Sequence, residues 1–249
     1  EGLEAREHGR RLGPGERVPF EGEPRSRIQP GAAVERDDIA GDAAAAQGLK
    51  VLVVEKEPLF GGTTARSGGW LWIPGTRLAI EQGIEEPPGA AQVYLRHEAA
   101  THFDAQRVDA FLENGPKAVD FFISRTCVRF DMPPVFPDYH AEAPGGRPGG
   151  RSMVTRPFDG RELGPRIKQL APPLPELTVF GMMLGSGKEI WHFMRAFRSL
   201  ESFVYVARRL ARHALDVLLH GRGMTLTNGN ALAGRLAKAA MDLNVPVWL

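Results

Sequence analysis

The sequence has few of the features that mark a specialised class of protein. It contains one cysteine, Cys127, so no disulfide can form within the chain, and no cysteine or histidine stands near it at zinc-site spacing. No apolar run reaches the 18 residues that suggest a membrane-spanning helix, and the first residues lack the apolar segment of a secretion signal. From these absences we expect a cytoplasmic protein.

Neither sign of charge dominates the chain. Thirty-one Lys and Arg residues balance 30 Asp and Glu residues, which leaves a formal net charge of +1. The sequence therefore offers no whole-chain electrostatic argument for a nucleic-acid partner. The 43% hydrophobic content over 249 residues is typical of a soluble globular protein with one large or two ordinary domains.

The order of the apolar segments predicts an α/β fold. Residues 43–47 indicate the last turns of a helix, and the run LKVLVV at 49–54 indicates a buried parallel strand. A helix at 231–243, capped by Asn228 or Asn230, then leads to a second strand at 245–249. Residues 1–40 are rich in Glu, Arg, Gly and Pro, so we expect a disordered or non-native segment that contributes no strand to the sheet.

A long insertion separates these two strands. Helical spacing at 89–100 and 104–123 predicts two helices, the second restarted by the Gly-Pro pair at 115–116. Residues 130–175 suggest a loop that lines a site, and residues 188–220 predict a helix that breaks near Ser199. We therefore expect a first part of the sheet domain at 41–85, a mainly helical substrate or cap region at 86–222, and a return to the sheet domain at 223–249.

The segment that follows the first strand predicts a cofactor site. VLVVEK (51–56) ends the strand and GGTTARSGG (61–69) comes after it. An acidic residue at the carboxyl end of a buried parallel strand can accept hydrogen bonds from both hydroxyls of a dinucleotide ribose, and adjacent glycines let the backbone approach a pyrophosphate. Glu55 alone favours an ordinary strand followed by a flexible glycine loop, whereas the whole unit favours a dinucleotide site.

Residues 41–75 resemble the flavin-binding segment of the FAD-dependent 3-ketosteroid dehydrogenases, within the fumarate reductase and succinate dehydrogenase flavoprotein superfamily. The shared pattern is an EK strand end, FGG, a Ser/Thr pair, SGG and an aromatic strand closing on proline, here VEKEPLFGGTTARSGGWLWIPG. The resemblance continues through FPDYHAEAPGGRPGGRS (136–152) and GMTLTNGNALAGRLAKAAMDLNVPVWL (223–249). It implies an incomplete Rossmann-like FAD-binding domain, FAD as cofactor, a hydrophobic steroid substrate and an external electron acceptor.

The same resemblance implies which residues contact the cofactor. They are Glu55 and Lys56 at the adenosine ribose, Gly61, Gly62, Thr63 and Thr64 at the pyrophosphate, and Ser67, Gly68 and Gly69 on the flavin side. For Trp70 and Trp72 we favour packing in the core over contact with substrate.

One part of the family pattern is absent. A dinucleotide fold places G-x-G-x-x-G after its first strand, about 20 residues before the acidic residue, and no such pattern precedes Glu55 in a strand-to-helix context. The resemblance thus implies a fragment that lacks the first strand and loop and also the carboxyl-terminal part of the family. A degenerate relative that has lost its cofactor is the alternative.

The resemblance also implies a catalytic tyrosine. Tyr139 in FPDYH matches an active-site tyrosine of the family. In the implied reaction a hydride leaves C1 of a 3-ketosteroid for the flavin N5 while a tyrosinate-like base removes the C2 proton. A free tyrosine has a pKa near 10, so that base needs a hydrogen-bonding helper, the role implied for Tyr139. The base itself and the groups that polarise the C3 carbonyl would lie beyond Leu249. Phe136 could line the steroid pocket or pack in the core.

Residues 188–238 carry nine Lys or Arg residues against three Asp or Glu residues, beside apolar runs. We favour an amphipathic helix packed on the cap, while weak association with an anionic membrane surface is the alternative. A fumarate-reductase-like enzyme for a small dicarboxylate and a non-enzymatic remnant are the other functions that the sequence allows.

Overall fold

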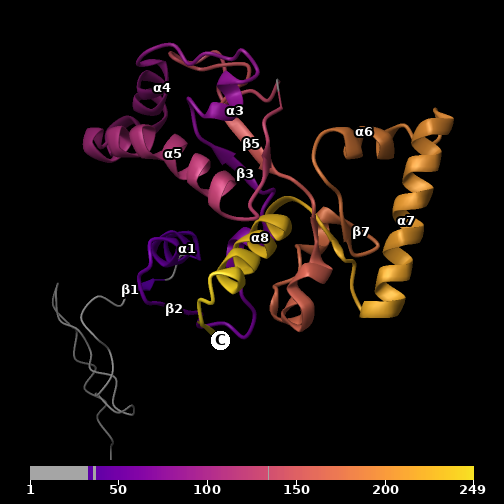
Figure 1. Ribbon diagram of the computed structural model, residues 1–249. Coiled ribbons are helices and arrows are strands. Elements are labelled where there is room, and N and C mark those ends of the chain that lie inside the picture. Colours follow the sequence, from indigo (N-terminus) through magenta and orange to yellow (C-terminus); the bar gives the residue numbers. More distant parts are fainter. Residues whose placement is uncertain (1–32, 36–37, 134) are drawn as a thin grey trace, which may run out of the picture.

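A three-stranded parallel sheet holds the predicted cofactor segment. The computed structural model describes residues 33–35, 38–133 and 135–249. In the sheet β2 lies between β1 and β10 and runs parallel to both, with α1 joining β1 to β2 (Figure 1). The bounds of these elements are Ala33–Glu35 for β1, Asp38–Ala46 for α1, Val51–Val54 for β2 and Val247–Trp248 for β10. The carboxyl end of β2 is therefore central in this sheet.

Strand β1, at Ala33–Glu35, corrects the prediction that residues 1–40 contribute no strand, and residues 36–37 lie outside the described residues. Val34 pairs with Leu52 in the parallel ladder of β1 and β2. A three-residue strand of Ala, Val and Glu is too short for its apolar pattern to stand out, and its pairing depends on the open edge of β2. The helix expected to end at 43–47 begins at Asp38. The prediction for residues 1–32 lies outside the described residues.

A second, antiparallel sheet and three helices form the body that carries α4 and α5 in Figure 1. Its strands, in the order β3-β5-β4, are β3 (Trp70–Trp72), β5 (Ser152–Thr155) and β4 (Phe130–Asp131). Its helices are α3 (Arg77–Ile80), α4 (Ala90–Ala99) and α5 (Ala105–Arg125), with a 3₁₀ turn, η1, at Ala100–His102. Asp104 caps α5 by accepting a hydrogen bond from the Arg107 N–H, and Val119 and Phe122 face the sheet.

The remaining elements lead from the second sheet to a projecting arm. They are β6 (Phe158–Asp159), η2 (Gly160–Gln169), η3 (Pro175–Leu177), β7 (Thr178–Val179), β8 (Met182–Met183), α6 (Lys188–Met194), α7 (Leu200–His220) and β9 (Thr225–Leu226). β6 pairs with β9, and β7 pairs with β8. In Figure 1, α6 and α7 lie at the side of the molecule away from β2.

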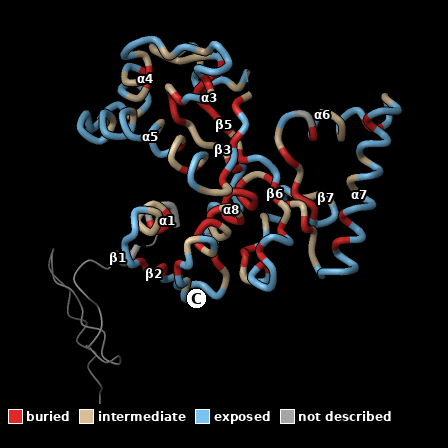
Figure 2. Tube along the Cα trace, in the orientation of Figure 1, coloured by how far each residue is buried: buried red, intermediate tan, exposed pale blue. Residues whose placement is uncertain are grey.

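Helix α8 joins these parts. It spans Asn228–Asp242 and is buried along most of its length (Figure 2). Ala231 packs in the cluster with η2 and β6, Leu232 packs with α5 and the second sheet, and Ala240 packs with β2. An apolar helix surface on all sides is expected where a helix is enclosed by neighbouring elements. The small residues of α8 allow α2 (Gly62–Arg66) to pack closely against it.

Several predictions about single elements are confirmed and others are wrong. The helices predicted at 89–100 and 104–123 are present as α4 and α5, and the predicted break is present because Ser199 caps α7. Pro116 does not restart α5, which continues through it. Helix α8 begins at Asn228, three residues before the predicted start, and its N-cap is Thr227. Residues 130–175 contain short strands and a 3₁₀ helix, because β5 pairs with β3, a partner far away in sequence. The mixed helix and sheet class is confirmed, and the division at residues 85 and 222 stays a prediction.

Candidate functional site

Glu55 directly follows β2 at the centre of the parallel sheet. Its backbone N–H donates to the Trp248 carbonyl (2.8 Å), and its carboxylate Oε1 accepts from the Glu57 N–H (3.0 Å). The side chain of Lys56 is exposed and lies 3.2 Å from Glu57 Oε1. The Glu55 carboxylate is thus oriented by its own turn, and a carboxylate oxygen has acceptor capacity left for ligand hydroxyls.

A tight glycine turn leads into the short helix α2. Gly61 has a φ of 103° and Gly62 a φ of 44°, both in the region that favours glycine. A Cβ on Gly61 would lie 2.9 Å from Ala65 Cβ and 3.2 Å from Ala233 Cβ, whereas a Cβ on Gly62 would meet nothing within 4 Å. The inner glycine is therefore needed for packing, and the outer one leaves open space. The exposed residues of this turn and helix are Gly62, Thr63, Thr64, Arg66, Ser67 and Gly68.

The end of α2 is bonded to the first turn of α8. Ser67 Oγ donates to the Thr64 carbonyl (2.9 Å) and accepts from the Gly69 N–H (3.1 Å), while the Gly229 N–H donates to the Ser67 carbonyl (3.1 Å). A Cβ on Gly69 would overlap the backbone of Asn228. The glycines predicted on the flavin side thus include one, Gly69, that the packing of two backbones requires.

An aromatic cavity of about 350 Å³ lies between β3, α4 and the loop at 136–139. Trp70 stacks on Phe136 with ring centroids 3.7 Å apart, and the Trp72 ring lies 5.8 Å from that of Tyr94. Tyr139 lies at the mouth of the cavity with 98% of its surface exposed. The lining residues are Trp70, Trp72, Tyr94, Leu95, Glu98, Phe136, Pro137, Asp138, Tyr139 and Ser152. A mostly apolar wall with a few polar groups is typical of small-molecule sites.

A buried ion-pair network supports this cavity. Arg151 is fully buried and pairs with Asp138 (Nη1 to Oδ2, 2.7 Å) and with Glu86 (Nη2 to Oε1, 2.6 Å). The Trp72 indole N–H donates to Asp138 Oδ1 (2.7 Å). The guanidinium carbon lies 5.5 Å from the centroid of the Trp72 ring, within cation–π range. The network therefore joins polar and aromatic parts of the cavity wall.

Two titratable groups at the rim, His140 and Glu98, are paired with each other. His140 Nδ1 lies 2.8 Å from Glu98 Oε2, and hydrogen bonds from His140 and His97 lower the pKa of Glu98. The His140 backbone N–H donates to the Tyr94 hydroxyl (3.4 Å), and burial raises the pKa of that hydroxyl. The Tyr94 hydroxyl is consequently protonated at neutral pH.

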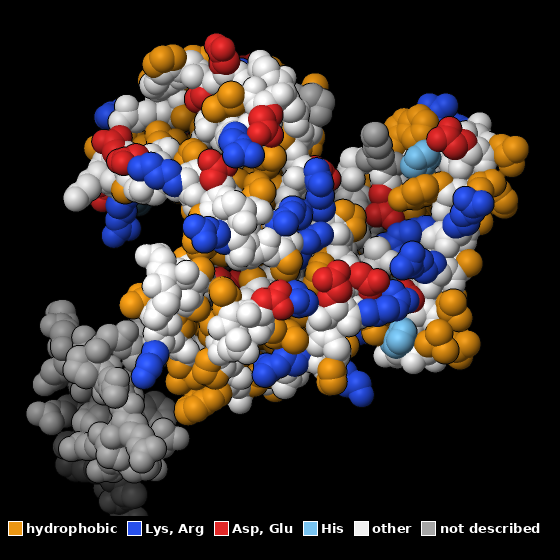
Figure 3. Space-filling model, viewed as in Figure 1, with side chains coloured by type: hydrophobic (Ala, Val, Ile, Leu, Met, Phe, Trp, Pro, Cys, Tyr) orange, Lys and Arg blue, Asp and Glu red, His pale blue; other side chains and the backbone are white. Residues whose placement is uncertain are grey.

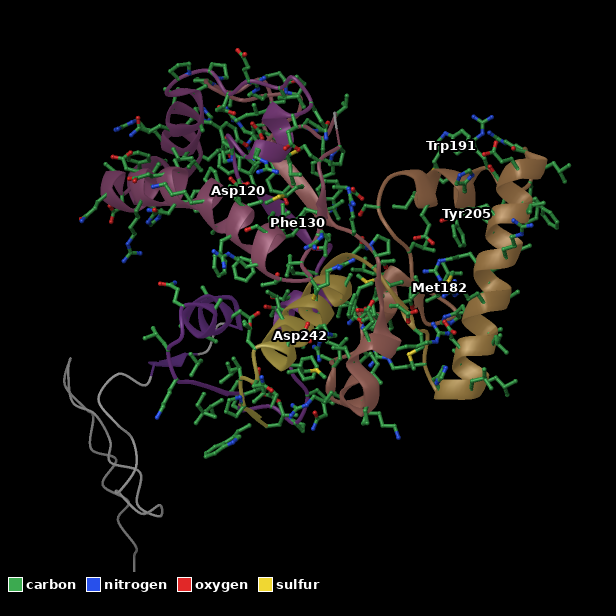
Figure 4. All side chains as sticks on the ribbon, viewed as in Figure 1. Asp120, Phe130, Met182, Trp191, Tyr205 and Asp242 are labelled. Atoms are coloured by element: carbon green, nitrogen blue, oxygen red, sulfur yellow. The ribbon has the colours of Figure 1, made fainter. Side chains whose placement is uncertain are left out.

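A larger groove of about 640 Å³ lies between α6 and α7, apart from the aromatic cavity. Tyr205 stacks on His192 across it with ring centroids 4.4 Å apart, and Figure 4 shows Tyr205 reaching from α7 toward α6. Arg209 pairs with Glu189 (2.7 Å) in its floor. Burial raises the pKa of Tyr205. No residue predicted from the sequence to act in catalysis or cofactor binding lies in this groove.

Comparison with known proteins decides the family. The model of a family described as FAD binding domain matches residues 39–249. The chain belongs to this FAD binding domain family. The chain is 40% identical over 205 residues to a 4-oxocyclohex-2-ene-1-carboxylate 5-dehydrogenase of Sinomonas cyclohexanicum. The aligned region covers 82% of this chain and 34% of that protein. It is 32% identical over 206 residues to a 3-oxosteroid 1-dehydrogenase of Comamonas testosteroni, covering 81% of this chain and 35% of the relative.

A solved structure agrees with the family. The 3-ketosteroid Δ1-dehydrogenase of Sterolibacterium denitrificans, in complex with 1,4-androstadiene-3,17-dione, superposes with a TM-score of 0.72 at 30% identity over 88% of this chain and 39% of that chain. The predicted resemblance to the FAD-dependent 3-ketosteroid dehydrogenases is confirmed, and FAD is the cofactor that the family indicates. The chain spans about a third of the length of the curated relatives it matches.

The residues of this member of the FAD binding domain family fit one side of the cofactor better than the other. Glu55 at the sheet edge and the open space over Gly62 suit a ribose and a nearby phosphate. The sequence between β1 and α1 differs from the G-x-G-x-x-G pattern, because α1 begins at Asp38 and the two residues before it are Arg36 and Asp37 in place of glycines. An acidic residue at a helix N-terminus competes with a bound phosphate.

The predicted site residues fall into two groups in this member of the FAD binding domain family. The cofactor group at 55–69 follows β2, and Phe136 and Tyr139 lie together at the aromatic cavity. Their roles stay predictions. Sequence reasoning missed Tyr94 and Arg151, and it favoured the core for Trp70 and Trp72, which are half-buried in the cavity wall. Alternate aromatic residues in WLW were the available indication, because side chains two apart share one face of a strand.

The described part of the chain contains neither a candidate metal site nor a candidate membrane-spanning helix. No group of three or more His, Cys, Asp or Glu residues there could hold a metal ion. Among the described helices, none has the length and apolar character needed to cross a bilayer.

Proposed function

We propose that this chain supplies the FAD-binding segment and part of the substrate pocket of an oxidoreductase that desaturates a 3-ketosteroid. The flavin, when bound, accepts a hydride at N5. The pocket would hold the ring that carries the ketone against Trp70 and Phe136. Tyr139 would donate a hydrogen bond to the tyrosinate-like base that removes the C2 proton as the hydride leaves C1. We expect that base, and the groups that polarise the C3 carbonyl, from sequence beyond Leu249.

The charge of the aromatic cavity is the observation that supports a neutral substrate. Its acidic residues are Glu98 and Asp138, and its one neighbouring buried cation, Arg151, is bonded to two carboxylates. His140 at the rim is bonded to Glu98. A dicarboxylate would need uncommitted cations such as bidentate arginines, and the described lining of this cavity offers none. The fumarate-reductase-like alternative is therefore less well supported.

A keto acid is the second candidate substrate class. The 40% identical relative named for 4-oxocyclohex-2-ene-1-carboxylate favours it. Such a compound shares the cyclic ketone of a 3-ketosteroid, and its carboxylate would need a cation from another part of the protein.

Parallel assays separate the candidates. In the flavin-loaded enzyme that contains this chain, a 3-ketosteroid with an artificial electron acceptor should turn over faster than 4-oxocyclohex-2-ene-1-carboxylate with the same acceptor. It should also turn over faster than fumarate with a reduced dye as electron donor, at equal substrate concentration. Faster turnover of either carboxylate would contradict the proposed substrate class. Failure of the protein that contains this chain to bind flavin, together with absence of all three activities, would favour the non-enzymatic remnant.

We expect the 249-residue chain by itself to hold FAD weakly and to be inactive. The sequence between β1 and α1, Arg36 and Asp37, lacks the glycines that let a pyrophosphate approach a helix N-terminus. Gel filtration of the purified chain with added FAD should recover much less than one flavin per chain. If weak binding is measurable by fluorescence, Glu55→Gln should weaken it more than Lys56→Gln. Co-purification of stoichiometric FAD would contradict this expectation.

We also propose a weak association of the α6–α7 arm with anionic membranes. Met194, Phe197 and Leu200 at the turn between the helices are 78–98% exposed, and Arg195 and Arg198 lie between them. Figure 3 shows hydrophobic and basic side chains side by side on this arm. Apolar residues interleaved with arginines suit the interface of an anionic bilayer, which would also hold a hydrophobic substrate.

Sedimentation with vesicles tests this association. Phe197→Ser should lower binding to vesicles of phosphatidylcholine and phosphatidylglycerol about tenfold, because one large apolar side chain contributes roughly 1.5–3 kcal/mol when buried. Leu218→Ser, at the other end of α7, is the matched control and should have little effect. Equal binding of both variants and the unaltered chain would contradict the proposal.

A further inference from the structure

Arg151 holds four separate segments of the chain together at the aromatic cavity. It directly follows Gly150 and precedes β5, and its side chain has no exposed surface. It contacts the loop at Glu86, the strand β3 at Trp72, the helix α4 at Tyr94 and the loop at Asp138. Three of these four contact residues also line the cavity.

The charge balance of the network shows why an arginine is needed. The Nε and Nη2 atoms donate to both oxygens of Glu86 (3.0 and 2.6 Å), and Nη1 donates to Asp138 (2.7 Å). A planar guanidinium can make this two-pronged contact to one carboxylate and reach a second, whereas a lysine ammonium acts as a point charge. Removal of a partner from such a pair leaves a buried charge without compensation.

The contacts of Asp138 also restrain the backbone next to it in the chain. Its Oδ2 also accepts from the Arg147 N–H (2.9 Å), its Oδ1 accepts from Trp72 Nε1 (2.7 Å), and its own N–H donates to the Arg147 carbonyl (3.0 Å). Both the side chain and the backbone of Asp138 are therefore fixed. Tyr139 follows directly, and its exposed ring has no comparable anchor of its own.

We propose that Arg151 is a positioning residue that acts through Asp138 to set the place of Tyr139 at the mouth of the aromatic cavity. The part of this inference that concerns catalysis rests on the proposed function of Tyr139. The part that concerns the order of the loop does not, because it depends only on the contacts of Asp138. A purely structural ion pair would stabilise the fold without any special coupling to Tyr139.

A double-mutant cycle on kcat tests the coupling. In the flavin-loaded enzyme that contains this chain, Arg151→Lys should lower kcat for a 3-ketosteroid about tenfold with little change in KM, because small displacements of a reacting group are costly. In the Tyr139→Phe background the same change should alter kcat less than twofold, since the hydroxyl that Arg151 positions is gone. Equal losses in both backgrounds would overturn the proposal.

Hydrogen exchange of the 249-residue chain tests the loop without flavin or turnover. Arg151→Lys should speed the exchange of amides at 138–147 about tenfold and leave α8 unchanged. Arg209→Lys, which alters another ion pair with an 11% exposed arginine side chain, is the matched control and should leave 138–147 unchanged. A uniform rise across the chain, or no rise at 138–147, would overturn the positioning role.

A milder variant covers the case in which Arg151→Lys does not fold. Trp72→Phe removes one hydrogen bond to Asp138 and keeps an aromatic ring. It should speed exchange at 138–147 about threefold, a smaller rise than the one expected when the charged contact is altered by Arg151→Lys. No change in exchange there would overturn the proposal. If Tyr139→Phe leaves kcat unaltered while exchange responds as expected, the proposed function of Tyr139 fails and the positioning of the loop stands.

Discussion

Tyr139→Phe should lower kcat for a 3-ketosteroid by about 100-fold or more in the flavin-loaded enzyme that contains this chain. The substitution removes one hydroxyl and keeps the ring, so the stacking of Trp70 on Phe136 should persist. A positioned acid–base group contributes about 10²–10⁴-fold, and support of the base by Tyr139 falls at the low end of that range. KM should change much less, because the hydroxyl is expected to act mainly in the transition state.

The matched control is Tyr205→Phe. Tyr205 lies on α7 beside the separate groove and has a neighbour, His192, that does not line the aromatic cavity. Loss of the Tyr205 hydroxyl should change kcat by less than about twofold, as expected of a substitution away from the site. If Tyr139→Phe behaves like this control under conditions where chemistry limits turnover, Tyr139 has a packing role and the catalytic assignment moves to residues outside this chain.

Gly229→Ala should lower the free energy of unfolding by about 2 kcal/mol. A Cβ at this position would overlap the Thr64 carbonyl oxygen and lie 2.7 Å from the Ser67 carbonyl oxygen, and neither backbone atom can move without displacing α2. Overpacking of this kind costs roughly 1–3 kcal/mol or more, which exceeds the gain of up to about 1 kcal/mol from replacing glycine in a helix. Thermal unfolding should show a fall in Tm of roughly 4–8 °C.

Gly234→Ala provides the control within the same helix. Its Cβ would lie 3.0 Å from a Leu226 methyl carbon and 3.1 Å from a ring carbon of Phe158, both of which are side-chain atoms that can shift. The helix propensity gained should offset this contact, so the free energy of unfolding should change by less than about 1 kcal/mol. A similar effect of both substitutions would show that the close packing of α2 on α8 does not determine stability.

Local patterns in the sequence predicted the elements that depend on neighbours along the chain. The apolar run before Glu55 predicted β2, and the helical spacing at 104–123 predicted α5. The glycines at 61 and 62 have positive φ, as expected of a tight turn. These features depend on residues within a few positions of one another.

Features that depend on distant partners were not predictable in the same way. β5 forms because it pairs with β3, about 80 residues earlier in the chain, and β1 depends on the edge of β2. Glycine spacing alone did not show that Gly69 lies against the backbone of Asn228. The role of Arg151 could be seen only once Glu86 and Asp138, 65 and 13 residues away, were known to lie on either side of it.

The measurement that tests the account most directly is anaerobic reduction of the flavin. The flavin-loaded enzyme that contains this chain is mixed with 4-androstene-3,17-dione without any electron acceptor, and the absorbance of oxidised flavin is followed. We predict that the absorbance falls to the reduced level within one turnover and that the steroid gains a ring double bond. Unchanged flavin absorbance with the steroid, together with reduction by 4-oxocyclohex-2-ene-1-carboxylate, would contradict a ketosteroid dehydrogenase.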